Sequence, residues 1–315
     1  MTVKPLRLVM PCFILVLVSL GVSRAEVCRT AKTAPAQQIA DADAALVPLD
    51  DKVATSAAIR THLPWGAPRN PPSAVHEHLL IQKDYVTDYD DDLRISIWEG
   101  HRLTAADVKK VLKRTEAFRP DPRLADPVSA TCDDYHGSTE YDRGHMAPSG
   151  DFTKSLTSML NSFLLSNMTP QSKNLNEGYW QQFETYVRFW AKEYGTVWVI
   201  TGAVFDYDGD GHRDTDTSVK KLKDRVGVPS AYYKIITRKP LLGRIQAIAI
   251  LLPHEKCGNE DCTTERKATP FEDYLAEHIT SIRAIEGVTG LDFFPNLSKS
   301  QQDNLETNQV PALWN

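Results

Sequence analysis

The stretch YDRGHMAPSGDF, Tyr141 to Phe152, places aspartate, arginine, glycine and histidine at four consecutive positions and then turns small and polar. The ordinary pKa of histidine lies near neutrality, so a histidine can act as a general base. The neighbouring arginine brings a cation and the glycine a flexible backbone position. This short segment therefore predicts a catalytic site in which a proton acceptor and a cation act together.

Hydrolysis of a phosphodiester bond is a reaction that needs such a set. It requires a base for the attacking water, a cation on the phosphoryl oxygens and stabilisation of the leaving oxygen. Histidine suits the first task and Mg²⁺ the other two. Because Mg²⁺ gives up its water reluctantly, the protein need supply only one or two oxygen ligands.

Two candidate oxygen ligands, Asn176 and Glu184, lie downstream in NLNEGYWQQFETYVRFWAKEYG, residues 174–195, which has the strongest helical pattern of the chain. Eight residues apart on a helix, they would lie roughly 80° from each other, close enough to flank one ion through a bound water. Spacing alone does not favour this site over a helix N-cap at Asn176 and a solvated charge at Glu184.

The remaining pattern predicts a mixed α+β protein, a sheet with helices packed on it. Residues 76–90 and 93–103 alternate like neighbouring strands, and three further strands are expected in residues 196–208, 229–238 and 244–253. Residues 104–114 predict a short helix and residues 270–290 an amphipathic one. In the strongest helix, the apolar residues at helical spacing are expected to pack in the core, and Gly195 to end it. They are Trp180, Phe183, Val187 and Trp190.

Length and composition indicate a soluble folded protein. The chain has 315 residues, of which 24% are charged and 42% hydrophobic, ordinary values for a globular protein with a sizeable core. Residues 1–25 resemble a secretory signal peptide, with Lys4 and Arg7 before an apolar run over residues 8–22. A membrane anchor is the alternative, but the run is short for a bilayer and lacks a strong stop-transfer flank.

The signal peptide predicts a secreted or periplasmic protein, which would have no stable membrane association once this segment is removed. Removal of the segment would leave 33 basic and 41 acidic residues, a formal net charge of −8. We expect an N-terminal arm or linker over residues 26–73, either a tether or a docking arm. A folded domain over residues 74–298 and a C-terminal tail over residues 299–315 are expected to follow.

The cysteines fit an oxidising compartment. Four remain after removal of the signal segment: Cys28, Cys132, Cys257 and Cys262. Two disulfides are expected, Cys257–Cys262 closing a short loop and Cys28–Cys132 joining distant parts of the chain. A zinc site is disfavoured, because the spacing lacks paired CxxC motifs.

Three segments together resemble the DNA/RNA non-specific endonuclease family, the ββα-metal or His-Me finger nucleases that include the Serratia nuclease and endonuclease G. They are YDRGHMAPSGDF, FLLSNMTPQSKNLNEGYWQQFE and VPSAYYKI. DRGH alone would be weak evidence for this family. The ordered set of DRGH, then SN-x-x-PQ, then N-x-x-x-W with a following Glu is specific to it. The resemblance covers roughly residues 75–296 and implies the antiparallel sheet and helices of that fold.

The resemblance also implies roles for the candidate residues. His145 would be the general base that deprotonates water, Asn176 the direct protein ligand of Mg²⁺ (or Mn²⁺), and Glu184 a ligand of a metal-bound water. Asp142 and Arg143 would brace the strand and the phosphate side. Cleavage of DNA and RNA would leave a 5′-phosphate and a 3′-hydroxyl.

Two positions depart from the family pattern. Phe163 stands where the Serratia enzyme has an asparagine, three residues before the SN pair. The arginine that stabilises the transition state is not set by the sequence either, because residues 113–124 offer three. We take Arg114 and Arg119 as the candidate nucleic-acid contacts, with Arg123 as the third; solvent-exposed charge is the alternative for all three.

The stretch DYDGDGHRD, residues 206–214, resembles an EF-hand loop and predicts a structural Ca²⁺ site. Gly211 occupies the turn position and His212 would contribute its backbone carbonyl, but Thr217 replaces the usual bidentate Glu. A similar loop is found in the nuclease-like domain of ectonucleotide pyrophosphatase/phosphodiesterases. A solvated acidic turn is the alternative. The carboxylates would come from Asp206, Asp208, Asp210 and Asp214.

We therefore expect a secreted, metal-dependent endonuclease whose substrates are DNA and RNA; the sequence indicates no oligomeric state. Basic residues before DRGH, among them Lys109, Lys110 and Lys113, would offset the acidic net charge locally. The alternative is a non-catalytic nuclease-like module that binds nucleic acid or protein. A phosphodiesterase for small nucleotides or lipids would need a closed pocket that the sequence does not indicate.

Overall fold

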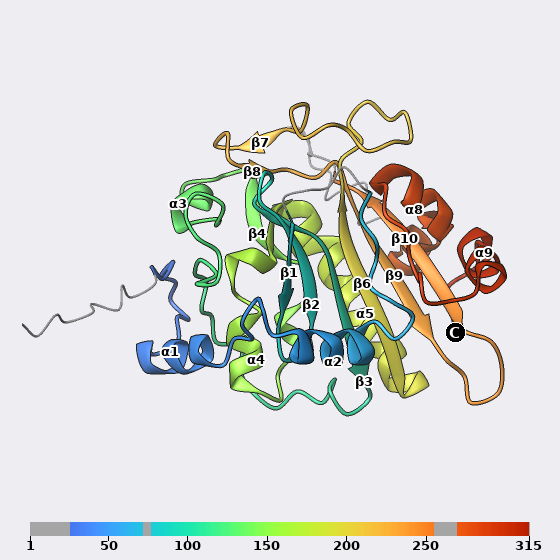
Figure 1. The fold of residues 1–315 in the computed structure, drawn as a ribbon, viewed down its shortest axis with the longest axis horizontal. Helices are drawn as coiled ribbons and strands as arrows, with labels where there is room; N and C mark the ends of the chain where they lie inside the picture. The colour runs from blue at the N-terminus through green and yellow to red at the C-terminus, as the bar shows by residue number, and fades with distance from the viewer. Residues whose placement is uncertain (1–25, 72–76, 255–269, 315) are drawn as a thin grey trace, which may run out of the picture.

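The computed structural model describes residues 26–71, 77–254 and 270–314. At its centre lies a seven-stranded antiparallel sheet with the order β1-β2-β3-β6-β9-β10-β11 (Figure 1). Its strands are β1 (Glu77–Ile81), β2 (Val86–Asp90), β3 (Ile95–Thr104), β6 (Thr196–Val204), β9 (Ala231–Arg238), β10 (Gln246–Pro253) and β11 (Ile279–Thr280). The predicted α+β class with an antiparallel sheet is confirmed. The proposed signal peptide and the Cys257–Cys262 pair lie outside the described residues.

Two short ladders and several helices surround this sheet. The ladders pair β4 (Tyr141–His145) with β5 (Met168–Ser172), and β7 (Lys221–Leu222) with β8 (Val226–Gly227). The helical elements are α1 (Ala36–Ala44), α2 (Lys52–His62), α3 (Cys132–Tyr135), η1 (Ser149–Asp151), α4 (Leu156–Asn161), η2 (Leu165–Asn167), η3 (Leu175–Trp180), α5 (Gln181–Tyr194), α7 (Phe271–Glu277), α8 (Ile282–Thr289) and α9 (Lys299–Thr307).

The sheet carries a hydrophobic core on each face. Alternation along β9 shows this directly, since Tyr232 and Ile236 belong to one buried cluster and Tyr233 and Ile235 to the other. α5 packs on the first face, whereas α2 and α8 contribute to the second. The sheet is therefore the middle layer of a three-layer structure.

The long helix is largely as predicted. The apolar residues Phe183, Val187 and Trp190 of α5 are buried, and Gly195, with a φ of 79°, follows its last turn. The segment before α5 differs from the prediction, because η3 is π-helical and Gly178 departs from helical geometry. Asn176 therefore lies on a distorted turn ahead of α5.

Two other helix predictions are wrong in detail. Residues 104–114 form turns: the backbone N–H and hydroxyl of Thr104 both donate to Asp107, and the Leu112 N–H bonds the carbonyl of Thr153 at 3.0 Å. Residues 270–290 form two helices, α7 and α8, separated by the short strand β11. In both places bonds to another chain segment replace continuous helical ones.

The N-terminal arm is a docked segment. Within it, α1 lies beside α4, and α2 lies across the strands β1 to β3 (Figure 1). The indole of Trp198 donates to the carbonyl of Thr61 at 3.1 Å, and Leu63 is buried. The C-terminal segment also packs on the domain, because the Trp190 indole donates to the carbonyl of Trp314 at 3.0 Å.

A buried ion cluster joins β3 to the turn after β4. The imidazole of His101 lies between the carboxylates of Glu99, at 2.7 Å, and Asp151, at 3.2 Å, and all three side chains are almost fully buried. Burial by itself lowers the pKa of His101, but the two carboxylates outweigh it and raise this pKa to about 9. His101 is therefore a buried cation at neutral pH.

We predict a pH-dependent stability from this cluster. Because the folded-state pKa of His101 lies above the ordinary value of 6.5, its contribution is complete below pH 6.5 and is lost as the pH rises through 9. Its upper limit is on the order of 3 kcal/mol. Urea unfolding of wild type and His101→Gln should differ most at about pH 6 and much less at about pH 10. A difference that stays constant over this range would contradict a charged His101.

Candidate active site

The ladder between β4 and β5 carries the DRGH segment. Asp142 lies opposite Gln171, and His145 opposite Met168. The backbone of Gly144 lies against the side chain of Gln171, where a Cβ atom would come within 2.2 Å of the carboxamide. A residue other than glycine at position 144 would therefore push the two strands apart.

Asn167, of the SN pair, fixes the chain directly after His145. Its side-chain oxygen accepts from the Ala147 N–H at 2.9 Å, and its amide donates to the Ala147 carbonyl at 3.0 Å and to the Ser162 carbonyl at 2.8 Å. Asn167 is fully buried. These bonds extend the ladder through side-chain atoms and hold the position of His145.

His145 lies in an aromatic pocket and is only 8% exposed. Its ring makes an edge contact with Phe163, with centroids 4.8 Å apart, and lies 6.0 Å from Phe118. Among the described residues, its Nε2 atom has no hydrogen-bond partner. Burial, followed by the positive charges of Arg114 and Arg143, holds the pKa of His145 well below its ordinary value. The imidazole is thus neutral and able to accept a proton.

Phe163, the residue that departs from the family pattern, connects His145 to an arginine. The guanidinium of Arg114 lies 4.9 Å from the centroid of the Phe163 ring and also bonds Ser149 at 3.1 Å and Glu116 at 3.0 Å. Arg114 nevertheless keeps 47% of its side chain exposed. A second guanidinium, that of Arg143, lies 4.0 Å from the Phe118 ring. Two cations therefore sit on the aromatic walls around the histidine.

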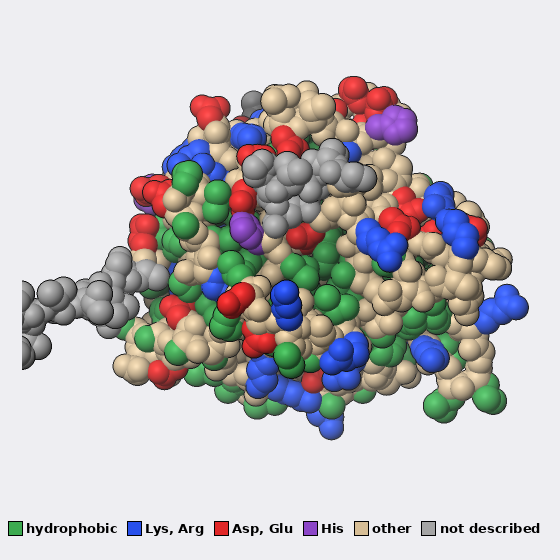
Figure 2. Space-filling model, in the orientation of Figure 1, with side chains coloured by type: hydrophobic (Ala, Val, Ile, Leu, Met, Phe, Trp, Pro, Cys, Tyr) green, Lys and Arg blue, Asp and Glu red, His purple; other side chains and the backbone are tan. Residues whose placement is uncertain are grey.

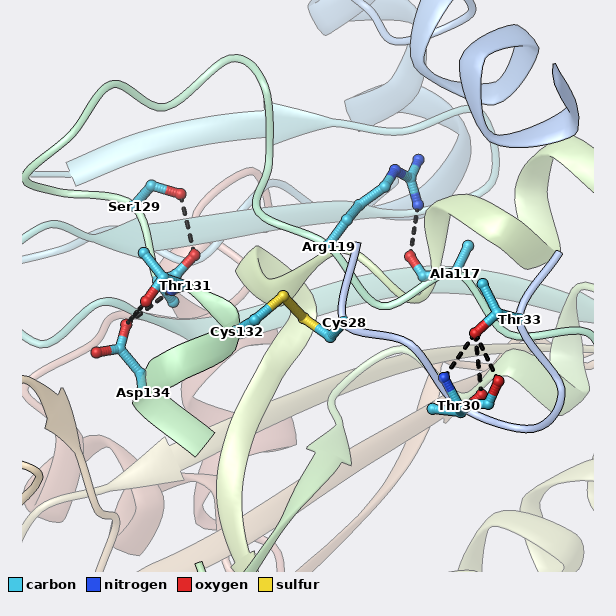
Figure 3. Close-up of a disulfide and its surroundings, with 10 residues drawn as sticks. Cys28, Thr30, Thr33, Ala117, Arg119, Ser129, Thr131, Cys132 and Asp134 are labelled. Atoms are coloured by element: carbon cyan, nitrogen blue, oxygen red, sulfur yellow. Dashed lines mark hydrogen bonds between the residues drawn. A yellow bond between two sulfur atoms is a disulfide. The ribbon is translucent and has the colours of Figure 1, made fainter. Parts of the chain in front are cut away.

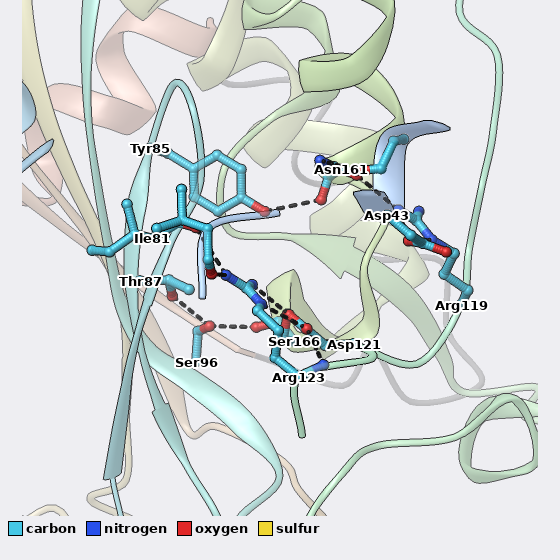
Figure 4. A network of polar contacts seen from close by, with 12 residues as sticks. Asp43, Ile81, Tyr85, Thr87, Ser96, Arg119, Asp121, Arg123, Asn161 and Ser166 are labelled. Atoms are coloured by element: carbon cyan, nitrogen blue, oxygen red, sulfur yellow. Dashed lines mark hydrogen bonds and ion pairs between the residues drawn. The ribbon is translucent and has the colours of Figure 1, made fainter. Parts of the chain in front are cut away.

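The structure corrects the assignment of Arg119. Its side chain is fully buried and bonds Asp43 of α1, Asn161 of α4 and two backbone carbonyls, so it cannot reach a phosphate (Figure 4). Arg123 is also engaged, in a pair with Asp121 at 2.7 Å. Of the three candidates, only Arg114 lies beside His145. The sequence could not separate them, because their surroundings come from distant segments.

Asn176 meets the DRGH strand through Asp142. The Asn176 amide donates to the Asp142 carboxylate at 3.1 Å, so its carbonyl oxygen is the atom left for another partner. Both residues line a cleft of about 640 Å³, together with Arg114, Arg143 and Phe118. Thirty-four residues separate this pair in the chain.

Glu184 lies on the first turns of α5, with 16% of its side chain exposed. Burial raises the pKa of its carboxyl, and Arg188, whose guanidinium lies 3.4 Å from it, opposes this change. Arg188 also pairs with Asp151, the last acid of the opening stretch. Glu184 is thereby linked to the buried cluster of Asp151, His101 and Glu99.

Sequence reasoning did not find this chain of ion pairs. Its only sequence signal is the i,i+4 spacing of Glu184 and Arg188. The other members come from β3 and η1. Lys234 of β9, which is buried and donates to Thr201 at 2.8 Å, adds a further cation near Glu184.

The donor set fits a hard divalent cation. The carbonyl oxygen of Asn176 and the carboxylates of Asp142 and Glu184 are oxygen ligands of the kind that Mg²⁺ prefers. The Nε2 atom of His145 is buried without a hydrogen-bond partner among the described residues, which suits an atom that accepts a proton. The paired Asn176 and Asp142 therefore present oxygen donors that fit a hard divalent cation.

The acidic loop after β6 closes on itself. Ligand oxygens of Asp206, Asp208 and Asp210 lie within 4.8 Å of one another, and each of these carboxylates, like that of Asp214, also accepts a backbone N–H of the loop. Gly211 has a φ of 85° at the turn. Three of the predicted carboxylates therefore converge on one point.

Comparison with protein families agrees with this geometry. The family model described as DNA/RNA non-specific endonuclease matches residues 69–300. The chain belongs to this family. Its antiparallel sheet with helices on both faces is consistent with the ββα-metal nuclease fold that the sequence predicts.

Named relatives of this nuclease family cover most of the domain. A mitochondrial nuclease named EXOG from Danio rerio is 31% identical over 71% of this chain and 63% of its own length. Nuclease C1 from Cunninghamella echinulata is 32% identical over 72% of this chain and 86% of its own. Venom phosphodiesterase 2 from Crotalus adamanteus is 26% identical over 78% of this chain and 32% of its own. The chain thus spans 57% to 63% of the length of the zebrafish and human EXOG proteins.

Surface charge and membrane propensity add to this description. Lys and Arg side chains gather at the lower edge of Figure 2, where the loop after β3 emerges in Figure 1. Lys109, Lys110 and Lys113 of this loop are exposed.

Among the helices of the described residues, none is long and apolar enough to span a bilayer.

The surroundings of His145 predict its titration. Because burial and two arginines hold the pKa of the imidazole well below 6.5, the ring should remain neutral as the pH falls through 6.5. Nuclear magnetic resonance of ¹⁵N-labelled imidazoles in the metal-free protein measures this directly. His101, whose pKa the two carboxylates raise to about 9, is the internal reference. A midpoint at or above 6.5 for His145 would show that its ring is solvated.

Proposed function

We propose that the protein is a metal-dependent endonuclease that hydrolyses phosphodiester bonds of both DNA and RNA and leaves a 5′-phosphate and a 3′-hydroxyl. One observation carries the proposal: the buried Nε2 atom of His145 has no partner among the described residues, two arginines act on its ring, and Asp142 of the same strand bonds Asn176. Membership of the DNA/RNA non-specific endonuclease family supports it.

In this mechanism, His145 accepts the proton of the attacking water. The low pKa of the imidazole keeps the acceptor free at neutral pH, while Arg114 and Arg143 bind the phosphoryl oxygens and stabilise the negative charge of the transition state. Asp142 orients the carboxamide of Asn176 through their hydrogen bond. The aromatic walls, Phe118 and Phe163, exclude bulk water from the imidazole.

A hydrated Mg²⁺ or Mn²⁺, when bound, would polarise the phosphoryl oxygens and stabilise the leaving oxygen. Asn176 would supply its direct ligand, and Glu184 would hold one of its waters. Arg188 and the buried ion cluster keep the Glu184 side chain at the start of α5. The exposed lysines of the loop after β3 would attract the polyanionic substrate.

The Cys28–Cys132 disulfide supports the proposal that the enzyme acts in an oxidising compartment, secreted or periplasmic. Its S–S bond joins segments 104 residues apart (Figure 3). The expected signal peptide over residues 1–25 agrees with this location.

The catalytic assignment predicts a large loss of rate without His145. His145→Ala should lower kcat on plasmid DNA and on RNA by about 10² to 10⁴-fold, because the general base is removed. Asn176→Ala should abolish cleavage, and so should treatment of wild type with EDTA. Circular dichroism should show that both samples remain folded like the untreated wild type. His78→Ala, a partly exposed histidine of β1 that does not line the active-site cleft, is the matched control.

Equal cleavage rates for wild type and His145→Ala would show that His145 is not the general base. Nucleic-acid binding without any cleavage by wild type in Mg²⁺ or Mn²⁺ would instead favour a non-catalytic module.

The acidic loop is a proposed structural Ca²⁺ site. Three carboxylates that converge within 4.8 Å repel one another, and a bound cation would relieve this repulsion. The ligands would come from Asp206, Asp208, Asp210, the His212 carbonyl and Asp214. In the structure the Asp214 carboxylate accepts a backbone N–H, so its contribution would require a second free lone pair.

Calcium should therefore stabilise the fold through this loop. At a free concentration about 100-fold above Kd, Ca²⁺ should raise the free energy of unfolding by about 2.7 kcal/mol. Thermal unfolding with Ca²⁺ and with EGTA should show this gain in wild type and not in Asp208→Asn/Asp210→Asn. Asp224→Asn, in the turn between β7 and β8, is the control. A gain of equal size in the loop variant would place the ion elsewhere.

A further inference from the structure

The first described residues form one wall of the active-site cleft. The Cys28 N–H donates to the carbonyl of Phe118 at 2.8 Å, and Cys28 is disulfide-bonded to Cys132 of α3 (Figure 3). Further along, Ala34 and Lys32 exchange backbone hydrogen bonds with Glu116 at 2.8 and 2.9 Å. The arm thus runs beside the segment whose Phe118 contacts Arg143 and His145.

In the described part of the chain three arginines line this cleft, and two of them contact neighbouring side chains. Arg114 pairs with Glu116 and bonds Ser149, and Arg143 is stacked on the ring of Phe118. Arg29 is exposed, and within the described part of the chain it makes no hydrogen bond or ion pair. Cys28, the residue before it, is held on both its backbone and its side chain.

The cleft is otherwise unfavourable for a polyanion. Its lining includes five acidic residues, which outnumber the arginines. A nucleic-acid strand carries a charge about every 3.4 Å, so a chain that reaches Arg143 brings neighbouring phosphates into the same cleft. These phosphates need a cation of their own, beyond the two that surround His145. The acidic residues are Glu26, Glu116, Asp133, Asp142 and Glu177.

We propose that Arg29 is a second phosphate-binding residue, which binds a backbone phosphodiester next to the one that is cleaved. The inference rests on the proposed endonuclease function. Its ligand is the sugar-phosphate backbone, so Arg29 contributes equally to DNA and RNA and reads no base. The Cys28–Cys132 disulfide is the positioning element that holds Arg29 at the wall of the cleft.

The test compares substrates with one and with many phosphodiester bonds. Arg29→Gln should raise KM on a long single-stranded DNA about tenfold and leave kcat unchanged, because one charge-assisted contact is lost. On a thymidine ester with a single phosphodiester, kcat/KM should not change. The dependence of log KM on log salt should fall by about 0.7 to 0.9 units. Lys32→Gln, an exposed cation of the same segment that does not line the cleft, is the matched control.

Removal of the disulfide provides a second, independent test of the proposal. Cys28→Ser/Cys132→Ser should raise KM on the long DNA only, and Arg29→Gln should add little to it, because both changes remove the same contact. Arg29→Lys should restore much of the salt dependence. These assays use the full mature chain, and thermal unfolding verifies that each variant is folded.

Equal KM and equal salt dependence for Arg29→Gln and Lys32→Gln would overturn the proposal. A loss that is as large on the single phosphodiester would also overturn it, since Arg29 would then act at the scissile phosphate. Failure of wild type to cut either substrate would instead contradict the endonuclease function itself.

Discussion

The candidate site depends on the two-stranded ladder of β4 and β5. Its register sets Asp142 against Gln171, so that the helical turn that follows β5 delivers Asn176 to the Asp142 carboxylate. Backbone hydrogen bonds, and the close packing that Gly144 permits, thus decide the separation of two motifs that lie far apart in the chain. Asn167 completes this frame beyond His145. A slip of one residue in the ladder would turn every one of these side chains to the opposite face.

Burial acts in opposite directions on two groups of this site. His145 is surrounded by aromatic rings and arginines, and the pKa of its imidazole is lowered, which leaves a neutral base. His101 is equally buried but lies between two carboxylates, which raise the pKa of its imidazole and make it a structural cation. The same low-dielectric interior thus stabilises neutral and charged forms according to the neighbouring charges. Of these two histidines, only His145 has a buried ring nitrogen without a hydrogen-bond partner among the described residues. This difference suits a catalytic role for His145 and a structural role for His101.

Much of the fold and of the candidate site could be predicted, because the signals are local. Period-two alternation located β6, β9 and β10, and helical spacing identified the buried face of α5. The pairing of Cys28 with Cys132 was also correct. The errors occurred where distant segments compete with local preference. Residues 104–114 bond to Thr153 instead of forming a helix, and Arg119 is buried against Asp43 of the arm instead of facing a substrate.

The sequence by itself determined which chemical groups are available: a histidine, an arginine and a carboxamide in an order that is specific to one family, and the acidic loop. Residue type and spacing suffice for this, since they are properties of the chain. Tertiary structure alone decided which arginine stands beside His145, that Asp151 joins the ion pair of His101 and how the arm forms a wall of the cleft. These relations join segments that are tens of residues apart, and only packing brings such segments within the few ångströms over which buried charges and rings interact.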